Sequence, residues 1–238
     1  MRALWSAMLD LFLPRACARC GAAVAGEGAL CARCAAALPR LPAGGCRLCQ
    51  GPLAGGERCA VCQDDRVPLA QIAAEVAFAG ELAGWIRRYK YPGAGLAGLD
   101  PRTAALAAAL LADAARRLAD GELELIVPVP IHVQRLRQRG FHPAGELARG
   151  LARTLGVPAD LRALAQLRPT ASQTGLDRRA RRRNVRGAFA ARPGLRVPRC
   201  VALVDDVVTT GATLGEAARA LRRAGARRVV AVCVARTV

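Results

Sequence analysis

The chain has few aromatic residues, one lysine, two histidines and no long apolar run. Because Phe, Trp and Tyr make up only 3% of the 238 residues, the core must be built from Ala, Leu and Val. With Lys90 as the one lysine, arginine supplies the basic surface. No stretch reaches the roughly 18 to 20 uninterrupted apolar residues of a membrane-spanning helix. We therefore expect a soluble protein.

The length and overall composition fit a globular chain with one domain and a smaller module. At 238 residues the chain exceeds the roughly 150 residues that are usual for one domain. Its 53% apolar and 23% charged residues exclude the collagen-like and the low-complexity disordered classes.

The N-terminal segment has two interpretations, an export signal or a helix. Residues 3–13 form a short apolar stretch, but Asp10 interrupts it and Pro14 fits poorly near a cleavage site. We therefore expect a cytoplasmic protein in which residues 1–14 form an amphipathic helix. The apolar face of this helix would carry Leu4, Met8, Leu11 and Phe12.

The formal net charge of +18 suggests a polyanionic partner. Most of the excess lies between Arg135 and Arg199, where sixteen arginines stand against three acidic residues. One interpretation is a surface that binds the backbone of single-stranded DNA, although the scarce aromatics argue against base stacking. The alternative is a basic face that is simply solvated.

Eight of the ten cysteines form four C-x-x-C pairs. Each such turn lets two thiolates point at one ion, and two turns complete the tetrahedral S4 shell that Zn²⁺ prefers. The spacings C-x2-C-x10-C-x2-C and C-x2-C-x9-C-x2-C predict two tandem zinc ribbons, with interleaved pairing as an alternative. The expected ligands are Cys17, Cys20, Cys31, Cys34, Cys46, Cys49, Cys59 and Cys62.

The same cysteines allow two other interpretations, a disulfide framework and thioredoxin-like redox pairs. The first needs an export signal, and the second needs a strand and helix context that this segment lacks. Residues 15–66 hold few large apolar side chains, so we expect the metal to be structural. Cys200 and Cys233 stand alone in apolar runs and are expected to be buried, inert thiols.

Strand and helix patterns alternate over residues 67–238, which predicts an α/β fold with a parallel sheet between helices. A polar, Arg-rich stretch interrupts the alternation at residues 168–186. The expected strands are 71–80, 123–129, 161–167, 200–204 and 228–235. The expected helices are one through Trp85 and Tyr89, and 101–119, 146–155 and 214–225.

Residues 201–216, VALVDDVVTTGATLGE, form the most specific motif of this segment. An apolar strand ends in Asp205 and Asp206, and a Thr/Gly loop then enters a helix, so that backbone amides converge as in a phosphate cradle. Gly211 allows a close backbone approach. Adjacent carboxylates at this edge of a sheet can accept hydrogen bonds from vicinal hydroxyls. The alternatives are structural: Thr213 and Glu216 match a capping box, and the acids could act only as caps.

Residues 201–213 resemble the phosphoribosyl pyrophosphate (PRPP) signature of type I phosphoribosyltransferases. The resemblance implies that family's α/β fold, a parallel sheet flanked by helices, for residues 67–238, preceded by the Cys-rich zinc-ribbon module at 15–66. It implies that Asp205 and Asp206, as catalytic residues, hold the ribose hydroxyls, with Mg²⁺ on the pyrophosphate. The implied 5-phosphate site consists of Thr209, Thr210, Gly211, Ala212 and Thr213.

The order of motifs over nearly the whole chain is similar to that of the ComF family of competence proteins. The four C-x-x-C pairs precede RRYKYPG, IVPVPIHVQRLRQRGF, RPTASQTGLDRRARRRNVRGAF and the PRPP loop. The resemblance implies a pyrophosphate loop at 129–135 and a flexible loop that closes over the substrate. The residues implied for these two loops are Arg135, Arg139, Gln173, Arg178, Arg182 and Asn184.

One departure from the family concerns residues 139–143. The family usually has RGFNQ where this chain has RGFHP, so no role of the missing Asn and Gln is carried over. A histidine before proline, such as His142, is more often a turn or surface residue than an acid or base. The other histidine is His132. Lys90 is either an anion contact or a plain surface residue.

The resemblance implies a PRPP-binding protein with a part in the uptake or processing of transforming DNA. Its implied partners are PRPP, competence proteins and single-stranded DNA. One alternative is an active Mg²⁺-dependent phosphoribosyltransferase, in which a nitrogen nucleophile displaces pyrophosphate from C1 of PRPP. Another is a non-catalytic accessory protein that binds single-stranded DNA. A PRPP-responsive transcriptional regulator is disfavoured, because no helix-turn-helix segment is recognisable.

Overall fold

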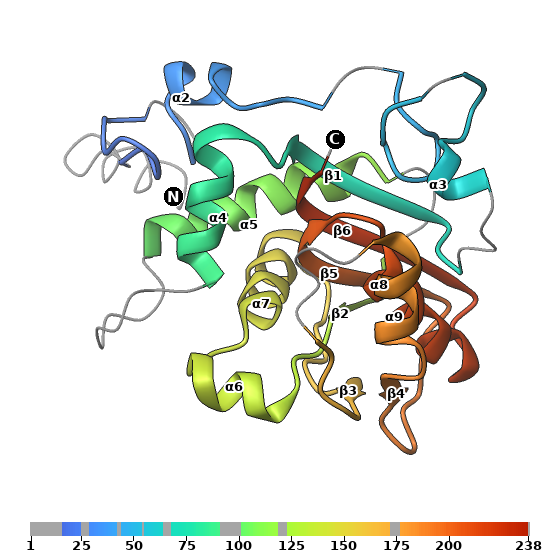
Figure 1. The fold of residues 1–238 in the computed structure, drawn as a ribbon. Helices are drawn as coiled ribbons and strands as arrows, with labels where there is room; N and C mark the ends of the chain where they lie inside the picture. Colours follow the sequence, from blue (N-terminus) through green and yellow to red (C-terminus); the bar gives the residue numbers. More distant parts are fainter. Residues whose placement is uncertain are drawn as a thin grey trace.

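A four-stranded parallel sheet forms the centre of the fold (Figure 1). The computed structural model describes residues 16–24, 29–41, 44–53, 55–63, 68–90, 101–118, 123–171 and 177–237. The expected helix at 1–14 and Gln173 lie outside these residues. The strand order is β1-β6-β5-β2, and every neighbouring pair is parallel. The strands are β1 (Gln71–Ala77), β2 (Leu125–Pro128), β5 (Cys200–Val208) and β6 (Arg228–Arg236).

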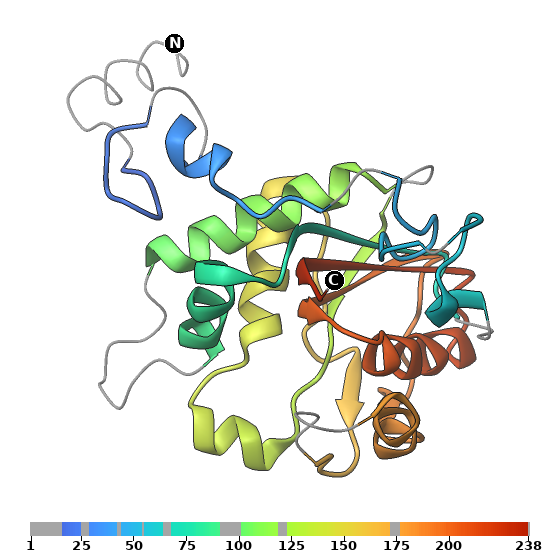
Figure 2. The same cartoon turned by 45° about the horizontal axis from the view of Figure 1, so that its top comes forward.

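Apolar side chains bury both faces of this sheet, as the continuous apolar runs of its strands require. One face carries three helices, which lie together on one side of the sheet in Figures 1 and 2. Leu111, Leu147 and Leu151 of these helices pack with Ile126 and Val232 of the sheet. The helices are α4 (Gly80–Lys90), α5 (Pro101–Arg116) and α7 (Pro143–Leu155).

The second face packs against α9 (Ala212–Arg223) and a small antiparallel sheet. In that core Leu214 and Leu221 of α9 lie with Phe189 and Val201. The expected strand at 161–167 does form a strand, but it belongs to the separate small sheet and not to the parallel sheet. The small sheet and the adjoining helix are β3 (Leu164–Gln166), β4 (Phe189–Ala191) and α8 (Arg178–Val185). The described residues thus confirm the parallel sheet flanked by helices.

The free edge of β1 is covered by the Cys-rich segment. The backbone N–H of Ile72 donates to the carbonyl of Leu48 at 2.6 Å, and the N–H of Ala74 donates to Gln50 Oε1 at 2.7 Å. Further along, the N–H of Ala77 donates to the carbonyl of Pro39 at 2.7 Å. An uncovered edge strand is a template for aggregation. The Cys-rich segment therefore completes the sheet.

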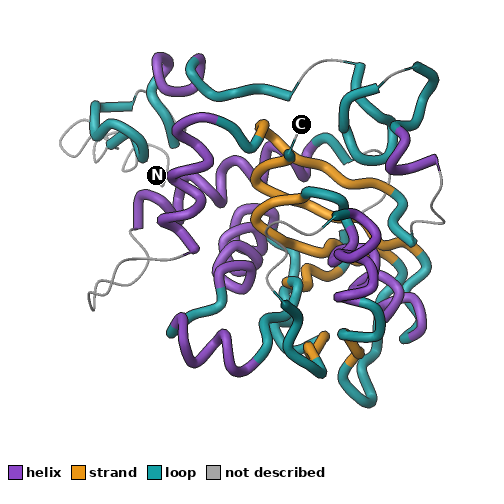
Figure 3. Tube along the Cα trace, in the orientation of Figure 1, coloured by secondary structure: helices purple, strands orange, loops and turns teal. Residues whose placement is uncertain are grey.

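The Cys-rich segment itself is mostly loop (Figure 3). Its helices are the short α2 (Ala32–Ala36) and α3 (Ala60–Gln63). Cys46, Leu48 and Cys49 belong to the same apolar core as α9 and the sheet. Gly51 allows the segment to lie close to Arg236 of β6, because a Cβ at this position would come within 2.3 Å of the Arg236 guanidinium. None of the helices in the described segments combines the length and the apolar character that spanning a bilayer needs.

Strand β5 runs further than the sequence indicates. The expected strand ended before Asp205, whereas β5 continues to Val208. The reason is the long partner strand: Asp205 pairs with Cys233, and Val207 pairs with Ala235. Asp205 and Asp206 therefore lie in the last residues of β5, where the strand is still paired with β6.

Candidate functional site

A cavity of about 1010 Å³ opens at the carboxyl ends of β2 and β5. Its wall is formed by the end of β5, the loop into α9, the segment after β2, and α6 (Val133–Arg139). Open α/β sheets bind ligands at this edge. The expected site residues that line it are Arg135, Arg139, Asp205, Asp206, Thr209, Gly211, Ala212 and Thr213.

The two carboxylates at this edge differ in their surroundings. Asp206 is buried, and its Oδ1 lies 3.0 Å from Lys90 Nζ and accepts the N–H of Val207 at 2.7 Å. Asp205 Oδ1 accepts the N–H of Asp206 at 2.9 Å. Burial, and then the neighbouring Asp206 carboxylate, raise the pKa of Asp205 to about 7. One carboxylate is thus held by a cation, while the other is easily protonated near neutral pH.

Lys90 is a site residue that the sequence left undecided. It lies at the end of α4 and lines the cavity. Burial alone would lower its pKa, but attraction to the carboxylates of Asp206 and Asp205 outweighs burial and raises the pKa above its ordinary value. Lys90 therefore stays charged and offsets part of the repulsion between the two acids.

The raised pKa of Asp205 makes folding stability depend on pH. Between about pH 4 and pH 7 the folded chain keeps a proton that the unfolded chain has lost, so the Asp205 contribution to stability falls as pH rises through this window. Asp205→Asn removes the penalty. We expect the substitution to raise the melting temperature, and to raise it more at pH 8 than at pH 5, as followed by circular dichroism.

The matched control for this experiment is Asp113→Asn on α5, where the carboxylate is exposed and pairs with Arg116 at 2.6 Å. We expect little change in its melting temperature at either pH. A stabilisation by Asp205→Asn that is equal at pH 5 and pH 8 would contradict the raised pKa.

The loop between β5 and α9 has the backbone of an anion cradle. Gly211 is the N-cap of α9, with φ +72°, a left-handed conformation that favours glycine. Gly211 has no side chain to cap the helix, and the Thr210 hydroxyl accepts the N–H of Ala212 at 3.4 Å. The start of a helix favours an anion through its N–H groups and its dipole. The capping box expected from Thr213 and Glu216 is wrong, because Glu216 accepts the N–H of Gly187 at 2.9 Å and pairs with Arg219 instead.

The arginines expected at the pyrophosphate lie on α6. Arg135 and Arg139 both line the cavity, and Arg135 Nη2 donates to the carbonyl of Thr170 at 2.6 Å. This bond joins α6 to the segment in front of α8. The helix was not expected from the sequence. It begins after His132, whose Nδ1 accepts the N–H of Gln134 at 3.3 Å, and ends at the left-handed Gly140.

The remaining expected residues lie elsewhere. Thr210 and Arg182 line a neighbouring cavity, described below. The Asn184 amide bonds both backbone groups of Ala171 at 3.0 Å, so it ties α8 to the end of the preceding segment. Arg178 is the first residue of α8, after the Asp177 N-cap. Conversely, Arg87 and Arg181 line the main cavity. Both lie in the family motifs, but neither was among the expected site residues.

His142, at the departure from the family pattern, supports the wall of the cavity. Its Nε2 lies 2.9 Å from the carbonyl of Val129, and burial lowers the pKa of the ring. A neutral ring that donates through Nε2–H fits this contact. The next turn is fixed by Tyr89, whose hydroxyl donates to the carbonyl of Pro143 at 2.9 Å. The histidine thus holds the segment after β2 in place.

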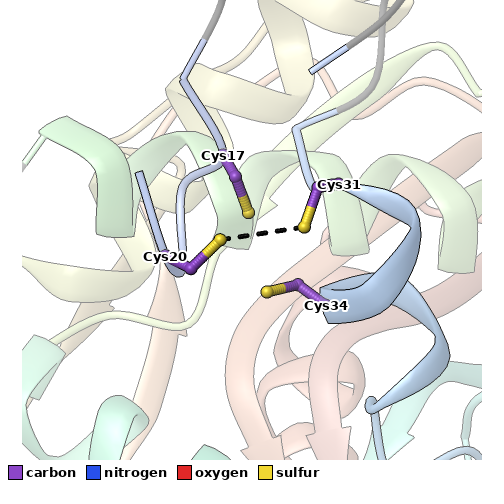
Figure 4. Close-up of side chains that lie close together, drawn as sticks. All are labelled: Cys17, Cys20, Cys31 and Cys34. Carbon is purple, nitrogen blue, oxygen red and sulfur yellow. Dashed lines mark hydrogen bonds between the residues drawn. The ribbon is translucent and has the colours of Figure 1, made fainter. Parts of the chain in front are cut away.

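The eight cysteines of the C-x-x-C pairs form two clusters, and Figure 4 shows the first. Within each cluster the Sγ atoms lie within 4.8 Å of one another. Cys20 and Cys31 Sγ are 3.7 Å apart, and Cys49 and Cys59 Sγ are 3.6 Å apart. With Zn–S bonds of about 2.3 Å, the edge of an S4 tetrahedron is about 3.8 Å. The clusters are Cys17, Cys20, Cys31 and Cys34, and Cys46, Cys49, Cys59 and Cys62.

This geometry fits Zn²⁺ and decides the pairing. The tandem assignment is confirmed, and interleaved pairing is excluded. All ten cysteines are free thiols, which excludes the disulfide framework. In the second cluster a hydrogen bond from the Cys62 thiol lowers the pKa of Cys49 to about 5, which favours the thiolate form that a metal binds. Cys200 and Cys233 are buried, as expected.

The comparisons with known proteins agree with this division. The double zinc ribbon domain family matches residues 8–63, and the phosphoribosyl transferase domain family matches residues 103–237. The DNA utilization protein YhgH of Salmonella typhimurium is 34% identical over 226 residues, 93% of this chain and 90% of that protein. Competence protein F of Haemophilus influenzae is 39% identical over 108 residues, 44% of this chain and 47% of that protein.

A similar solved structure is that of glutamine PRPP amidotransferase from B. subtilis complexed with ADP and GMP. It has a TM-score of 0.40 and 22% identity, and the match covers 60% of this chain and 29% of the enzyme. The two domain matches and the relative that spans nearly the whole chain carry the assignment. The chain belongs to the ComF family, in which a double zinc ribbon precedes a phosphoribosyl transferase domain.

Proposed function

We propose that the cavity at the carboxyl ends of β2 and β5 binds PRPP, and that the protein uses this site in the handling of DNA. The observation that carries the proposal is the meeting of three chemistries in one cavity: the carboxylates of Asp205 and Asp206, the loop through Gly211, and the guanidinium groups of Arg135 and Arg139. They suit, in turn, the hydroxyls, the 5-phosphate and the pyrophosphate of one ligand.

Each residue would have a separate part in binding. The carboxylates of Asp205 and Asp206 would accept hydrogen bonds from the two ribose hydroxyls. The loop amides and the hydroxyls of Thr209 and Thr213 would donate to the 5-phosphate at the start of α9. Arg135 and Arg139 would stand near the pyrophosphate, and Lys90 would keep the pair of acids from repelling each other.

The proposal also includes Mg²⁺ as a cofactor and the transfer of the phosphoribosyl group to an acceptor. Mg²⁺, when bound, would neutralise charge on the pyrophosphate oxygens. In a reaction, the bond from C1 of the ribose to the pyrophosphate oxygen breaks, and a bond from C1 to a nitrogen of the acceptor forms. Arginines around the cavity would stabilise the charge that develops on the leaving group. The proposed compartment is the cytoplasm, where zinc-binding thiols stay reduced.

The test is a calorimetric titration of PRPP with Mg²⁺ into the zinc-loaded full chain. We expect binding by the wild type and a loss of at least 100-fold in the Asp205→Asn, Asp206→Asn double variant, because two charge-assisted hydrogen bonds from the ribose hydroxyls would become weaker contacts with neutral amides. Asp113→Asn serves as the control and should bind like the wild type. Absence of binding by folded wild-type protein would leave the domain without its proposed ligand.

A direct contact with single-stranded DNA is the second candidate function. The observation that favours it is helix α8, in which five of eight residues are arginine, next to both cavities. The names of the relatives point to DNA utilization and competence. Binding through this helix would fall steeply with salt and depend little on sequence. A titration of oligothymidylate at rising salt concentration would reveal it, as binding that weakens steeply with salt.

A further inference from the structure

A second cavity, of about 510 Å³, lies behind the phosphate loop. Its lining residues come mainly from α8, α9 and the second zinc ribbon. Figures 1 and 2 show α8, α9 and α3 of that ribbon on the same side of the sheet. Thr210, Gly211 and Ala212 of the loop form one side of it. Gly211 and Ala212 also line the main cavity, so the two cavities share this loop as a wall.

The rim of the second cavity is strongly basic. Among the described residues that line it, Glu216 is the one carboxylate, and it already pairs with Arg219 at 2.8 Å and accepts the N–H of Gly187. Arg183, Arg186 and Arg223 are exposed and have no ion-pair partner in the part of the chain that the structure describes. The lining arginines are Arg182, Arg183, Arg186, Arg219, Arg223 and Arg236.

The inner end of the cavity carries a buried cation. Arg236 is 4% exposed and lies at the end of β6. Its Nη1 donates to the carbonyl of Cys49 at 2.8 Å, whereas its buried Nε has no hydrogen-bond partner. An unfilled buried donor on a charged group is costly, and such groups in native proteins are usually satisfied by a ligand, an ion or water. Arg236 thus gives the lining a buried cation that has one donor unpartnered among the described residues, and its charge also lowers the pKa of the neighbouring Cys49 thiol.

The rest of the lining is apolar. Leu48, Ile72, Val185 and Val208 face the cavity beside the arginines. Its volume falls within the range of about 300 to 1,000 Å³ that is typical of small-molecule sites. A small inorganic anion would bind the arginines but would leave the apolar side chains of the cavity exposed to water. The combination fits an anionic group attached to an apolar body.

We propose that the second cavity binds a phosphate ester of nucleotide size, with the phosphate among the arginines and the base and sugar against the apolar walls. The ligand is a free nucleotide or one nucleotide of a single strand, since both present the same chemistry. Binding there places a ligand on the far side of the PRPP loop and against the zinc ribbon. This site goes beyond the proposed function and does not depend on PRPP binding.

The test titrates adenosine 5′-monophosphate, a ten-residue oligothymidylate and inorganic phosphate separately into the zinc-loaded full chain. Each titration is run in the wild-type chain and in a chain with Asp205→Asn and Asp206→Asn, which removes both carboxylates from the main cavity. We expect the nucleotide or the oligonucleotide to bind more tightly than inorganic phosphate. Arg183→Ala with Arg223→Ala should weaken that binding at least tenfold, because two charge-assisted contacts are lost. Arg153→Ala, an exposed arginine on α7, is the matched control and should change nothing.

The outcomes separate the two sources and the two sites. Binding of the mononucleotide identifies a free nucleotide, and binding of the oligonucleotide alone identifies a single strand. In Gly51→Ala the added methyl group would push against Arg236. This variant should bind the mononucleotide or the oligonucleotide more weakly, while a cooperative thermal melt shows that it is still folded. Equal affinities in the wild-type background, the Arg183/Arg223 variant and the Arg153 control would overturn the proposal. So would the loss of all nucleotide binding in the Asp205/Asp206 background, since the ligand would then occupy the main cavity.

Discussion

Removing zinc from the second ribbon lowers the melting temperature of the whole chain by about 10 °C or more. Cys46, Leu48 and Cys49 belong to the core that covers one face of the sheet, and the carbonyl of Leu48 bonds the edge strand β1. Structural Zn²⁺ contributes about 10 to 16 kcal/mol of binding energy to folding in small zinc peptides. Since about 1 kcal/mol moves the melting temperature by about 2 to 4 °C in a chain of this size, loss of a few kcal/mol suffices.

The two ribbons provide a matched comparison for this prediction. The first cluster has its own small core around Cys17, Val24 and Cys34, and Cys20 is exposed. Cys49→Ser should therefore destabilise the chain much more than Cys20→Ser, and it should also promote aggregation by uncovering β1. Thermal melts monitored by circular dichroism, with zinc content measured on the same samples, give the answer. Melting that a chelator leaves unchanged would show that the metal does not hold this core.

Gly211→Val abolishes PRPP binding, with an expected loss of at least 100-fold, while the chain stays folded. The residue caps α9 with φ +72° and lines both cavities. A branched side chain there would stand where the backbone must approach the phosphate. A non-glycine residue in this conformation costs about 1 to 3 kcal/mol, which a domain with this core can tolerate.

The control is Gly156→Val at the end of α7. Gly156 has nearly the same backbone, φ +68°, and a Cβ there meets nothing within 4 Å. Both variants should lose a similar amount of stability, but only Gly211→Val should lose PRPP binding in calorimetry. Equal PRPP affinities in the two variants would show that the loop does not hold the phosphate.

The sequence predicted those features that depend on short, periodic patterns. The spacing of the C-x-x-C pairs predicted two tandem S4 sites, and the structure then excluded the interleaved alternative by placing Cys17 with Cys34 and Cys46 with Cys62. The apolar runs around Val201 and Val229 were enough for the parallel sheet, since strands buried on both faces must be apolar throughout.

Contacts between distant segments were not predictable in this way. The bond from Ile72 to Leu48 joins a strand to a loop, and neither residue type signals the other. Helix α6 was missed because its surface carries few apolar residues, so its sequence has no amphipathic pattern. The ion pair of Lys90 with Asp206 joins the end of α4 to the end of β5, and an isolated lysine gives no hint of it.

A crystal structure of the zinc-loaded chain with PRPP and Mg²⁺ tests the central claim most directly. We predict that the 5-phosphate lies at the start of α9, within hydrogen-bond distance of the backbone amides of residues 209–213. The ribose hydroxyls should contact the carboxylates of Asp205 and Asp206. Density for PRPP in the second cavity would contradict the account. So would a crystal grown with saturating PRPP and Mg²⁺ in which only water lies between the two carboxylates and the loop.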